Sequence, residues 1–221
     1  MPKSPETRKE ELLAAADALF RKDGVDCTAV SDIVREAHVS QGTFYNYFQS
    51  KDEIFAAVLE QATSDMMEEM RKTGERADLD PPQKLKLLSL QDFQMNRTND
   101  SLFDVLHESR YADAHQKYIV ARIEKLRPIY ANVIRQGVEM GIFHTSYPDE
   151  AAHFMLTAIK FVFDPAFFTY SEEGMIRMGQ AVGDFCERIL GAPHDVGSCN
   201  GEEWAQNIKQ YFRRNLHESD L

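Results

Sequence analysis

The sequence predicts an all-α protein in which a small N-terminal unit of short helices precedes a larger helical body. Nearly every periodic segment repeats its apolar residues at the three- and four-residue spacing of an amphipathic helix, and no run shows the sustained alternation of a β-strand. The 221 residues are enough to bury a sizeable core, and 43% hydrophobic with 28% charged residues is an ordinary globular composition.

Three short helices are predicted in the first fifty residues. The segment Thr7–Glu10 matches the capping box that begins a helix. A second helix is expected after Thr28, and a third, very short one after Ser40. In the third, Phe44 and Phe48 are four residues apart and are predicted to face the core.

The body is predicted to consist of longer helices. A second capping box, Ser50–Glu53, begins a long helix that extends past Met66, and Asp80 followed by two prolines begins the next. With boundaries good to a few residues, further helices are expected at about 82–97, 101–111, 115–140, 148–163, 172–190 and 203–216.

Charge and cysteine content exclude several classes of protein. A net charge of −11 argues against a generally basic nucleic-acid coat protein, although it leaves room for a local nucleic-acid site. Cys27, Cys186 and Cys199 are too few and too scattered for a disulfide framework or a C-x-x-C metal site. No apolar signal-peptide core is present at the N-terminus, and charged residues and a proline break the apolar stretch 154–168. We therefore expect a cytoplasmic protein without a membrane segment.

A short helix, a tight turn and a second short helix are the outline of a helix-turn-helix. The residues make this outline specific: TAVSDI at 28–33, AHVSQGTFYNYF at 37–48 and SKDEIF at 50–55. Over roughly residues 8–59, about a quarter of the chain, the sequence strongly resembles the tetracycline-repressor (TetR) family of transcriptional regulators. The resemblance implies a DNA-binding domain over 1–50 and a ligand-binding and dimerisation domain over 51–221. It further implies a homodimer that binds a palindromic double-stranded operator, as a repressor that a small, largely apolar ligand releases.

The chemistry of the recognition segment agrees with this resemblance. A glutamine such as Gln41 can bond an adenine edge with both amide atoms, and the methyl group of Thr43 suits a thymine methyl. The hydroxyls of Tyr45 and Tyr47 can donate to phosphate oxygens. Each residue taken alone would more often be plain surface or core, but the set at the family's spacing predicts DNA contact. The predicted DNA-binding residues are Thr28, Ser40, Gln41, Gly42, Thr43, Tyr45, Asn46, Tyr47 and Lys51.

Two features depart from the family pattern. His38 occupies the turn position where the family usually has glycine, so we expect it to adopt a positive φ at modest cost. Residues 1–55 hold seven Lys and Arg against ten Asp and Glu, a net charge of −3. Because non-specific DNA affinity is largely electrostatic, we expect it to be low. A binding module with an inactive DNA head is therefore one alternative.

The predicted dimer interface rests on the resemblance and on an apolar excess. The helix expected at 148–163 is apolar nearly all round, so it must be buried on more than one side. In the family the last two main helices pair with those of the partner, which assigns this role to 148–163 and 172–190; two ordinary core helices are the alternative. The predicted interface residues are Ala152, Leu156, Ile159, Phe161, Phe163, Met178, Val182, Phe185 and Ile189.

A ligand pocket in the body is implied by the resemblance alone. Apolar and aromatic side chains with a few polar tips are typical of such a pocket, although each of these residues also suits an ordinary core. The predicted lining residues are Met66, Met70, Met95, Phe103, His107 and Tyr111.

An enzyme with a carboxylate–histidine metal site is the second alternative. Glu150 and His153, like Asp104 and His107, have the spacing that helical di-iron proteins use. One carboxylate is an aspartate, however, and the additional inward glutamates of such sites are not evident. No zinc-protease, serine-hydrolase or phosphate-loop motif occurs either. We therefore predict no metal, no cofactor and no enzymatic activity.

Overall fold

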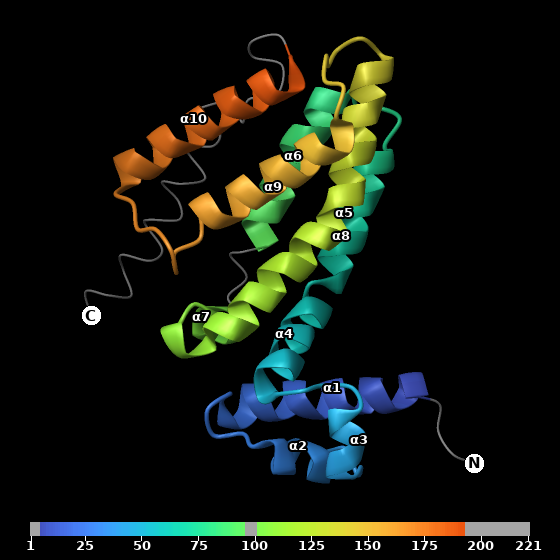
Figure 1. Cartoon of the computed structure of the whole chain (residues 1–221), viewed down its shortest axis with the longest axis vertical. Coiled ribbons are helices and arrows are strands. Elements are labelled where there is room, and N and C mark those ends of the chain that lie inside the picture. Colours follow the sequence, from blue (N-terminus) through green and yellow to red (C-terminus); the bar gives the residue numbers. More distant parts are fainter. Residues whose placement is uncertain (1–4, 96–100, 193–221) are drawn as a thin grey trace. The chain divides into compact units, whose positions relative to one another are not determined.

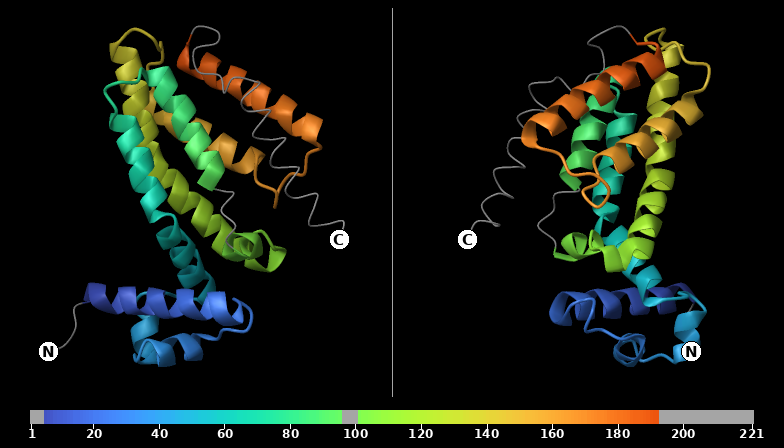
Figure 2. Two further views of the ribbon diagram at one scale, coloured as in Figure 1. Left: turned by 180° about the vertical axis from the view of Figure 1, so that it is seen from behind. Right: turned by 60° about the vertical axis from the view of Figure 1, so that its left-hand side comes forward.

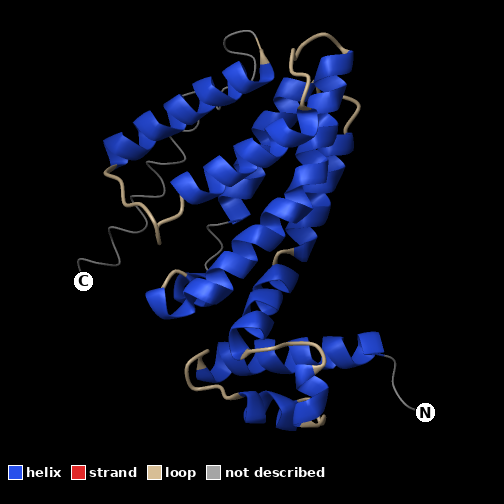
Figure 3. Ribbon diagram, viewed as in Figure 1, coloured by secondary structure: helices blue, strands red, loops and turns tan. Residues whose placement is uncertain are grey.

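The computed structural model describes residues 5–95 and 101–192, and within these ranges all regular structure is helical (Figure 3). This confirms the predicted all-α class, while the helix expected at 203–216 and Cys199 lie outside the described residues. Among the described residues, no helix is both long and apolar enough to cross a membrane. The elements are α1 (Pro5–Asp23), α2 (Val30–Glu36), α3 (Gln41–Tyr45), α4 (Lys51–Ala62), α5 (Ser64–Glu75), α6 (Pro81–Met95), α7 (Ser101–Leu106), the 3₁₀ turn η1 (Ser109–Tyr111), α8 (Ala112–Glu139), α9 (Pro148–Val162) and α10 (Glu172–Leu190).

The chain forms two compact units. Unit 1 consists of residues 1–65 and 95–122, and unit 2 of residues 66–94 and 123–221. Unit 1 therefore contains α1 to α4 together with α7, η1 and the first residues of α8. The predicted domain boundary after residue 50 coincides with the start of α4, and as a division between two functions it stays a prediction.

One hydrophobic core holds unit 1 together. In both views α2 and α3 lie on the same side of α1 (Figures 1 and 2). Phe20 of α1 meets Phe55 of α4 edge-on, with ring centroids 5.5 Å apart. The same cluster includes buried side chains from α7, η1 and α8, namely Leu102, Phe103, Leu106, Tyr111, Ala114 and Tyr118. Burial of these large side chains, at about 25 cal/mol per Å² of apolar surface, is what stabilises helices too short to persist alone.

Side-chain caps fix the starts of α4 and α6, as the sequence predicts. The hydroxyl of Ser50 accepts from the Glu53 amide at 3.1 Å, and the Glu53 carboxylate accepts from the amide of Gln49 at 2.6 Å. At α6, Asp80 and Gln83 each accept from the other's backbone amide, at 2.8 and 3.0 Å. Such caps satisfy amide groups that a helix leaves without an internal partner.

Two predicted helix boundaries are wrong. α1 begins at Pro5, so Thr7 lies inside the helix and does not cap it. The single long helix expected after residue 50 is two helices, because the chain breaks at Thr63. The Thr63 hydroxyl donates to the carbonyls of Leu59 and Glu60, and such local bonding competes with a regular helix.

Two further helices differ from their predicted ranges. The helix expected at 101–111 ends at Leu106 and is followed by η1, and α8 begins at Ala112 instead of residue 115. α8 continues through Pro128 without ending, although proline cannot donate a helical hydrogen bond.

Unit 2 combines apolar packing with buried charge. α9 and α10 run beside each other (Figure 2). Gly191 ends α10 in a left-handed conformation, and the carbonyl of Leu190 accepts from the His144 amide at 2.7 Å. The ammonium group of Lys160, on α9, donates to both carboxylate oxygens of Asp92, on α6, and both side chains are buried.

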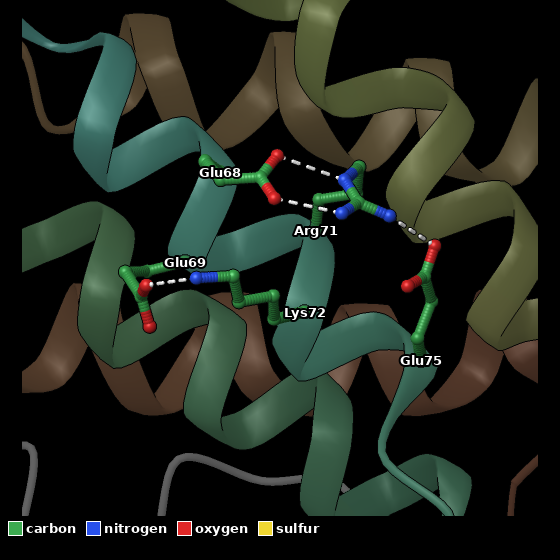
Figure 4. Close-up of polar contacts among 5 residues, drawn as sticks. All are labelled: Glu68, Glu69, Arg71, Lys72 and Glu75. Carbon is green, nitrogen blue, oxygen red and sulfur yellow. Dashed lines mark hydrogen bonds and ion pairs between the residues drawn. The ribbon is translucent and has the colours of Figure 1, made fainter.

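The exposed face of α5 carries a chain of ion pairs at helical spacing (Figure 4). Arg71 pairs with Glu68 at 2.7 Å and with Glu75 at 2.6 Å, and Lys72 pairs with Glu69 at 2.7 Å. Residues three and four apart lie on the same face of a helix, so this arrangement supports α5 locally and keeps that face polar.

The buried ion pair generates a stability prediction. We expect Lys160→Met to lower the free energy of unfolding by roughly 3–5 kcal/mol, because it leaves the Asp92 carboxylate buried without its cation. The double variant Asp92→Leu/Lys160→Met should recover most of this loss. Urea denaturation at neutral pH measures both, with Arg135→Met as the control because it removes the exposed ion pair of Arg135 with Asp149. An effect of Lys160→Met no larger than that of the control would contradict the prediction.

Candidate nucleic-acid interface

The turn between α2 and α3 has the geometry of a helix-turn-helix corner. His38 adopts a φ of +53°, which confirms the positive φ expected at this position. The Val39 amide donates to the carbonyl of Val34 at 3.0 Å and closes the end of α2. Histidine tolerates this conformation better than most residues, so the turn keeps its shape without glycine.

α3 is capped at its start and anchored at its end. Ser40 is its N-cap, with its hydroxyl accepting from the Thr43 amide at 3.1 Å and lying 2.9 Å from the Thr43 hydroxyl. Phe44 is fully buried and Phe48 is 3% exposed, with ring centroids 5.8 Å apart. This confirms that these two rings face the core, and it fixes which face of α3 points away from it.

The outward face of α3 is polar and accessible. Gln41, Gly42 and Asn46 are exposed, and Thr43 and Tyr47 are half-buried. Tyr45 is 52% exposed, with its ring edge-on to Phe44 at 5.3 Å. The space around Gly42 is open apart from the Ser40 hydroxyl, so backbone of another molecule can approach there. Donors, acceptors and a methyl group are thus available on α3 and on the two residues that follow it.

Two predicted DNA-binding residues outside α3, Thr28 and Lys51, also bond within the protein. Thr28 is buried, and its hydroxyl donates to the carbonyl of Gly24 at 2.9 Å. The ammonium group of Lys51 donates to the carbonyl of Val25 at 2.8 Å. An ammonium group has three donors, so Lys51 can bond a phosphate as well. The DNA contact of Thr28 stays a prediction that this geometry does not favour.

Ion pairs occupy several arginines of the N-terminal segment. Arg8 pairs with Glu11 at 3.3 Å, Arg21 with Asp17 at 2.8 Å, and Arg35 with an aspartate of its own helix. That aspartate, Asp32, has its pKa held below the usual range, first by the backbone amide of Ala29 and then by Arg35. Lys9 lies 6.0 Å from the ring centroid of Phe48, near the end of the recognition segment. These three arginines are thus paired within the protein, in keeping with the low non-specific affinity expected from the net charge.

The residues predicted to line a ligand pocket fall in both units. Met70 is fully buried and Met66 half-buried on α5, in unit 2. Met95 ends α6, and its side chain lies outside the described ones. In unit 1, Phe103 packs edge-on against Tyr118 at 5.7 Å, His107 against His115 at 5.1 Å, and Tyr111 against Phe55 at 5.3 Å.

The residues predicted for the dimer interface differ in accessibility. Ala152 and Leu156 are buried within the single chain. The others are half-buried or, in the case of Phe185, 57% exposed. Phe154, which the prediction omitted, is 64% exposed on α9. The apolar composition of α9 does not by itself reveal which of its faces the chain covers.

The carboxylate–histidine pairs of the metal alternative belong to different units. Glu150 and His153 are exposed on α9 in unit 2. His107 belongs to α7–η1 in unit 1, and the side chain of Asp104 lies outside the described ones.

Comparison with protein families identifies two matching segments. Residues 12–58 match the family described as bacterial regulatory proteins, tetR family. Residues 94–185 match the tetracyclin repressor-like C-terminal domain. Together the two segments make up more than half of the chain.

Individual relatives are transcriptional regulators. The uncharacterized HTH-type transcriptional regulator YvdT of Bacillus subtilis is 35% identical over 71 residues, 32% of this chain and 37% of YvdT, so the match spans well under two thirds of that relative. The HTH-type transcriptional repressor KstR2 of Mycolicibacterium smegmatis is 25% identical over 145 residues, 64% of this chain and 70% of KstR2.

A solved structure shares the fold. RolR, crystallised with its ligand resorcinol, superposes with a TM-score of 0.62 at 20% identity, covering 91% of this chain and 94% of RolR. The capped helix α3 and the turn before it lie within the first matched segment, and α7 to α9 lie within the second. The chain belongs to the TetR family of bacterial transcriptional regulators.

Proposed function

We propose that the protein is a homodimeric, sequence-specific repressor that binds a palindromic operator and is released by a small-molecule effector. The observation that carries this proposal is the outward face of α3. A capped helix held by two buried phenylalanines presents Gln41, Thr43, Tyr45 and Asn46 away from the core. Membership of a family of DNA-binding regulators favours this function over the metal-dependent enzyme.

The side chains of α3 suit two kinds of DNA contact. We assign base reading to Gln41 and Thr43, because they lie in the first turn of the recognition helix, where such helices meet base edges. Tyr45, Asn46, Tyr47 and Lys51 are assigned to the phosphate backbone, which positions the protein without reading sequence. Ser40 and Gly42 allow the close approach that these contacts need.

Dimerisation is supported by exposed phenylalanines in unit 2. Phe154 and Phe185 are more than half exposed on the adjacent helices α9 and α10, and Phe167 and Phe168 are about half exposed in the loop between them. Exposed apolar side chains gathered on neighbouring elements are typical of an interface. A second copy would cover them and supply the second recognition helix that a palindrome requires.

The effector is proposed to bind in the body and to be largely apolar with a polar group. Met66 and Met70 offer apolar contact on α5, and the other predicted lining residues remain candidates. Gln91 donates to the Thr73 hydroxyl at 3.0 Å, while its own carbonyl oxygen is buried and lacks a partner among the described residues. A ligand with one hydrogen-bond donor would satisfy that oxygen, since an unpaired buried acceptor is costly. KstR2 is named a repressor, which favours repression.

The first prediction concerns base reading. In vitro selection from random duplexes should enrich an inverted repeat for the wild-type protein. Gln41→Ala should lose discrimination at one position of each half-site, worth about 1–3 kcal/mol. Gln49→Ala removes an exposed glutamine outside α3 and serves as the control, which should select the wild-type sequence. If the wild-type protein enriches no duplex, the alternative of an inactive DNA head is correct.

The second prediction concerns the dimer. The double variant Phe154→Glu/Phe185→Glu should sediment as a monomer and lose operator binding, because charge repels the two copies at an apolar interface. Met140→Glu places the same charge on a 62% exposed residue at the end of α8 and should remain dimeric. A dimeric double variant would rule out the proposed interface.

The third prediction concerns the effector. Thermal-shift screening of small aromatic and aliphatic compounds, with resorcinol among them, should find a ligand that lowers operator affinity. A hundredfold loss of operator affinity corresponds to about 2.7 kcal/mol of coupling, and linkage requires operator to weaken ligand binding by the same factor. Ligand affinity measured with and without saturating operator tests this directly. Equal affinities would show that the ligand is not an inducer.

A further inference from the structure

The loop between α1 and α2 is bound by residues far along the chain. Asp26 lies in this loop, and its carboxylate accepts a hydrogen bond from the hydroxyl of Tyr111 in η1. The guanidinium group of Arg110 pairs with Asp26 at 2.6 Å and with Glu108 at 2.5 Å. All four residues belong to unit 1. We call them the Asp26 cluster.

Packing holds the ring of Tyr111 in place. The side chain is buried, and its ring meets Phe55 of α4 at 5.3 Å, which in turn meets Phe20 of α1 at 5.5 Å. Burial, and then the hydrogen bond to Asp26, raise the pKa of the Tyr111 hydroxyl far above its usual value. The hydroxyl therefore keeps its proton at neutral pH and can donate to Asp26.

Val25, the residue before Asp26, is hydrogen-bonded to a side chain of α4. The carbonyl of Val25 accepts from the Lys51 ammonium group at 2.8 Å, and Val25 itself is buried. Two consecutive loop residues are thus tied to two different elements, α4 and η1. The loop leads through Ala29, whose amide donates to the Asp32 carboxylate at 3.0 Å, directly into α2, and α2 packs against α3. The position of this loop therefore contributes to the position of the helix-turn-helix, together with the packing of α2 against α1.

The Asp26 cluster joins the two segments that the family comparison separates. Asp26 lies in the segment 12–58, and Arg110 and Tyr111 lie in the segment 94–185. Tyr111 is followed at once by α8, which runs without a break to Glu139. Movement of α8 would therefore act on η1, and through Asp26 on the loop that begins α2.

We propose that the Asp26 cluster is a positioning contact for the recognition helix and a second route, beside α4, by which the body controls DNA binding. The proposal rests on the function proposed above. It gives Tyr111 a role different from lining a ligand pocket, because its hydroxyl is committed to Asp26. The contact fixes the head in one orientation, so the two heads of a dimer match one spacing of operator half-sites. Loss of the contact lets each head adopt several orientations.

The test measures how much the affinity for operator DNA falls when the spacing between the two half-sites is changed. Operator duplexes selected by the wild-type protein are compared with duplexes whose half-sites are moved by one or two base pairs, using fluorescence anisotropy. Tyr111→Phe keeps the ring and removes the hydroxyl. It should lose about tenfold in affinity at the selected spacing, the order expected for one hydrogen bond to a charged acceptor. It should lose much less at the altered spacings, so that the preference for one spacing becomes weaker.

Asp26→Asn provides a second variant at an exposed residue, with Asp17→Asn as its matched control. Both substitutions remove one negative charge from the same segment, but the partner of Asp17 among the described residues is Arg21, four residues along α1. Asp26→Asn should reproduce the weakened spacing preference, and Asp17→Asn should retain the wild-type preference. A wild-type spacing preference in Tyr111→Phe and Asp26→Asn would overturn the proposal.

Amide exchange of the DNA-free protein separates failure of the cluster from failure of the function. Amides of residues 24–36 should exchange about tenfold faster in Tyr111→Phe than in the wild type, while those of the control Asp17→Asn are unchanged. If the wild-type protein selects no operator, the proposed function fails. The exchange measurement still tests whether the Asp26 cluster holds the loop before α2 in place. Unchanged amide exchange in Tyr111→Phe would overturn the proposed positioning role of the Asp26 cluster, whatever the DNA-binding result.

Discussion

The burial of Phe44 determines whether the rest of the head can act. α3 has five residues, far fewer than an isolated helix needs to persist in water. Its shape and direction therefore come from Phe44 and Phe48, which are buried in the core of unit 1, and from the Ser40 cap. Because side chains on a helix are separated by fixed rotations, anchoring one face decides which residues face outward. The outward position of Gln41 and Tyr45 is a consequence of that anchor.

The same core extends beyond the first fifty residues. Side chains of α7, η1 and α8 share a hydrophobic cluster with α1 to α4. A boundary drawn after residue 50 follows the change in local pattern, but apolar packing and the Asp26 cluster continue across it. A regulator needs this continuity, since an effector can act on DNA binding only if the body and the head share contacts whose free energy differs between two states.

Features that depend on residues close together in the chain could be predicted from the sequence. The caps at Ser40, Ser50 and Asp80, the positive φ of His38 and the inward rings of α3 all depend on a few neighbours. Features that depend on distant partners could not. Tyr111 and Asp26 are 85 residues apart and Lys160 and Asp92 are 68 apart, so no local pattern reveals either pair.

Composition also does not determine which face of an apolar helix is buried by its own chain. α9 is rich in apolar residues all round, and only packing decided that Leu156 is covered by its own chain while Phe154 is exposed. The break at Thr63 was missed for a related reason. A threonine among regularly spaced apolar residues is compatible with a continuous helix. Only the structure shows that its hydroxyl donates to a carbonyl of the preceding turn, which competes with the regular helix.

We propose that α3 is the part of the protein that contacts DNA. Hydrogen–deuterium exchange of the wild-type protein, with and without a duplex that it has selected, tests this most directly. If α3 contacts DNA, the largest fall in exchange upon DNA binding lies in residues 40–47, with little change along α9 and α10. Protection concentrated elsewhere, with residues 40–47 unaffected, would contradict it.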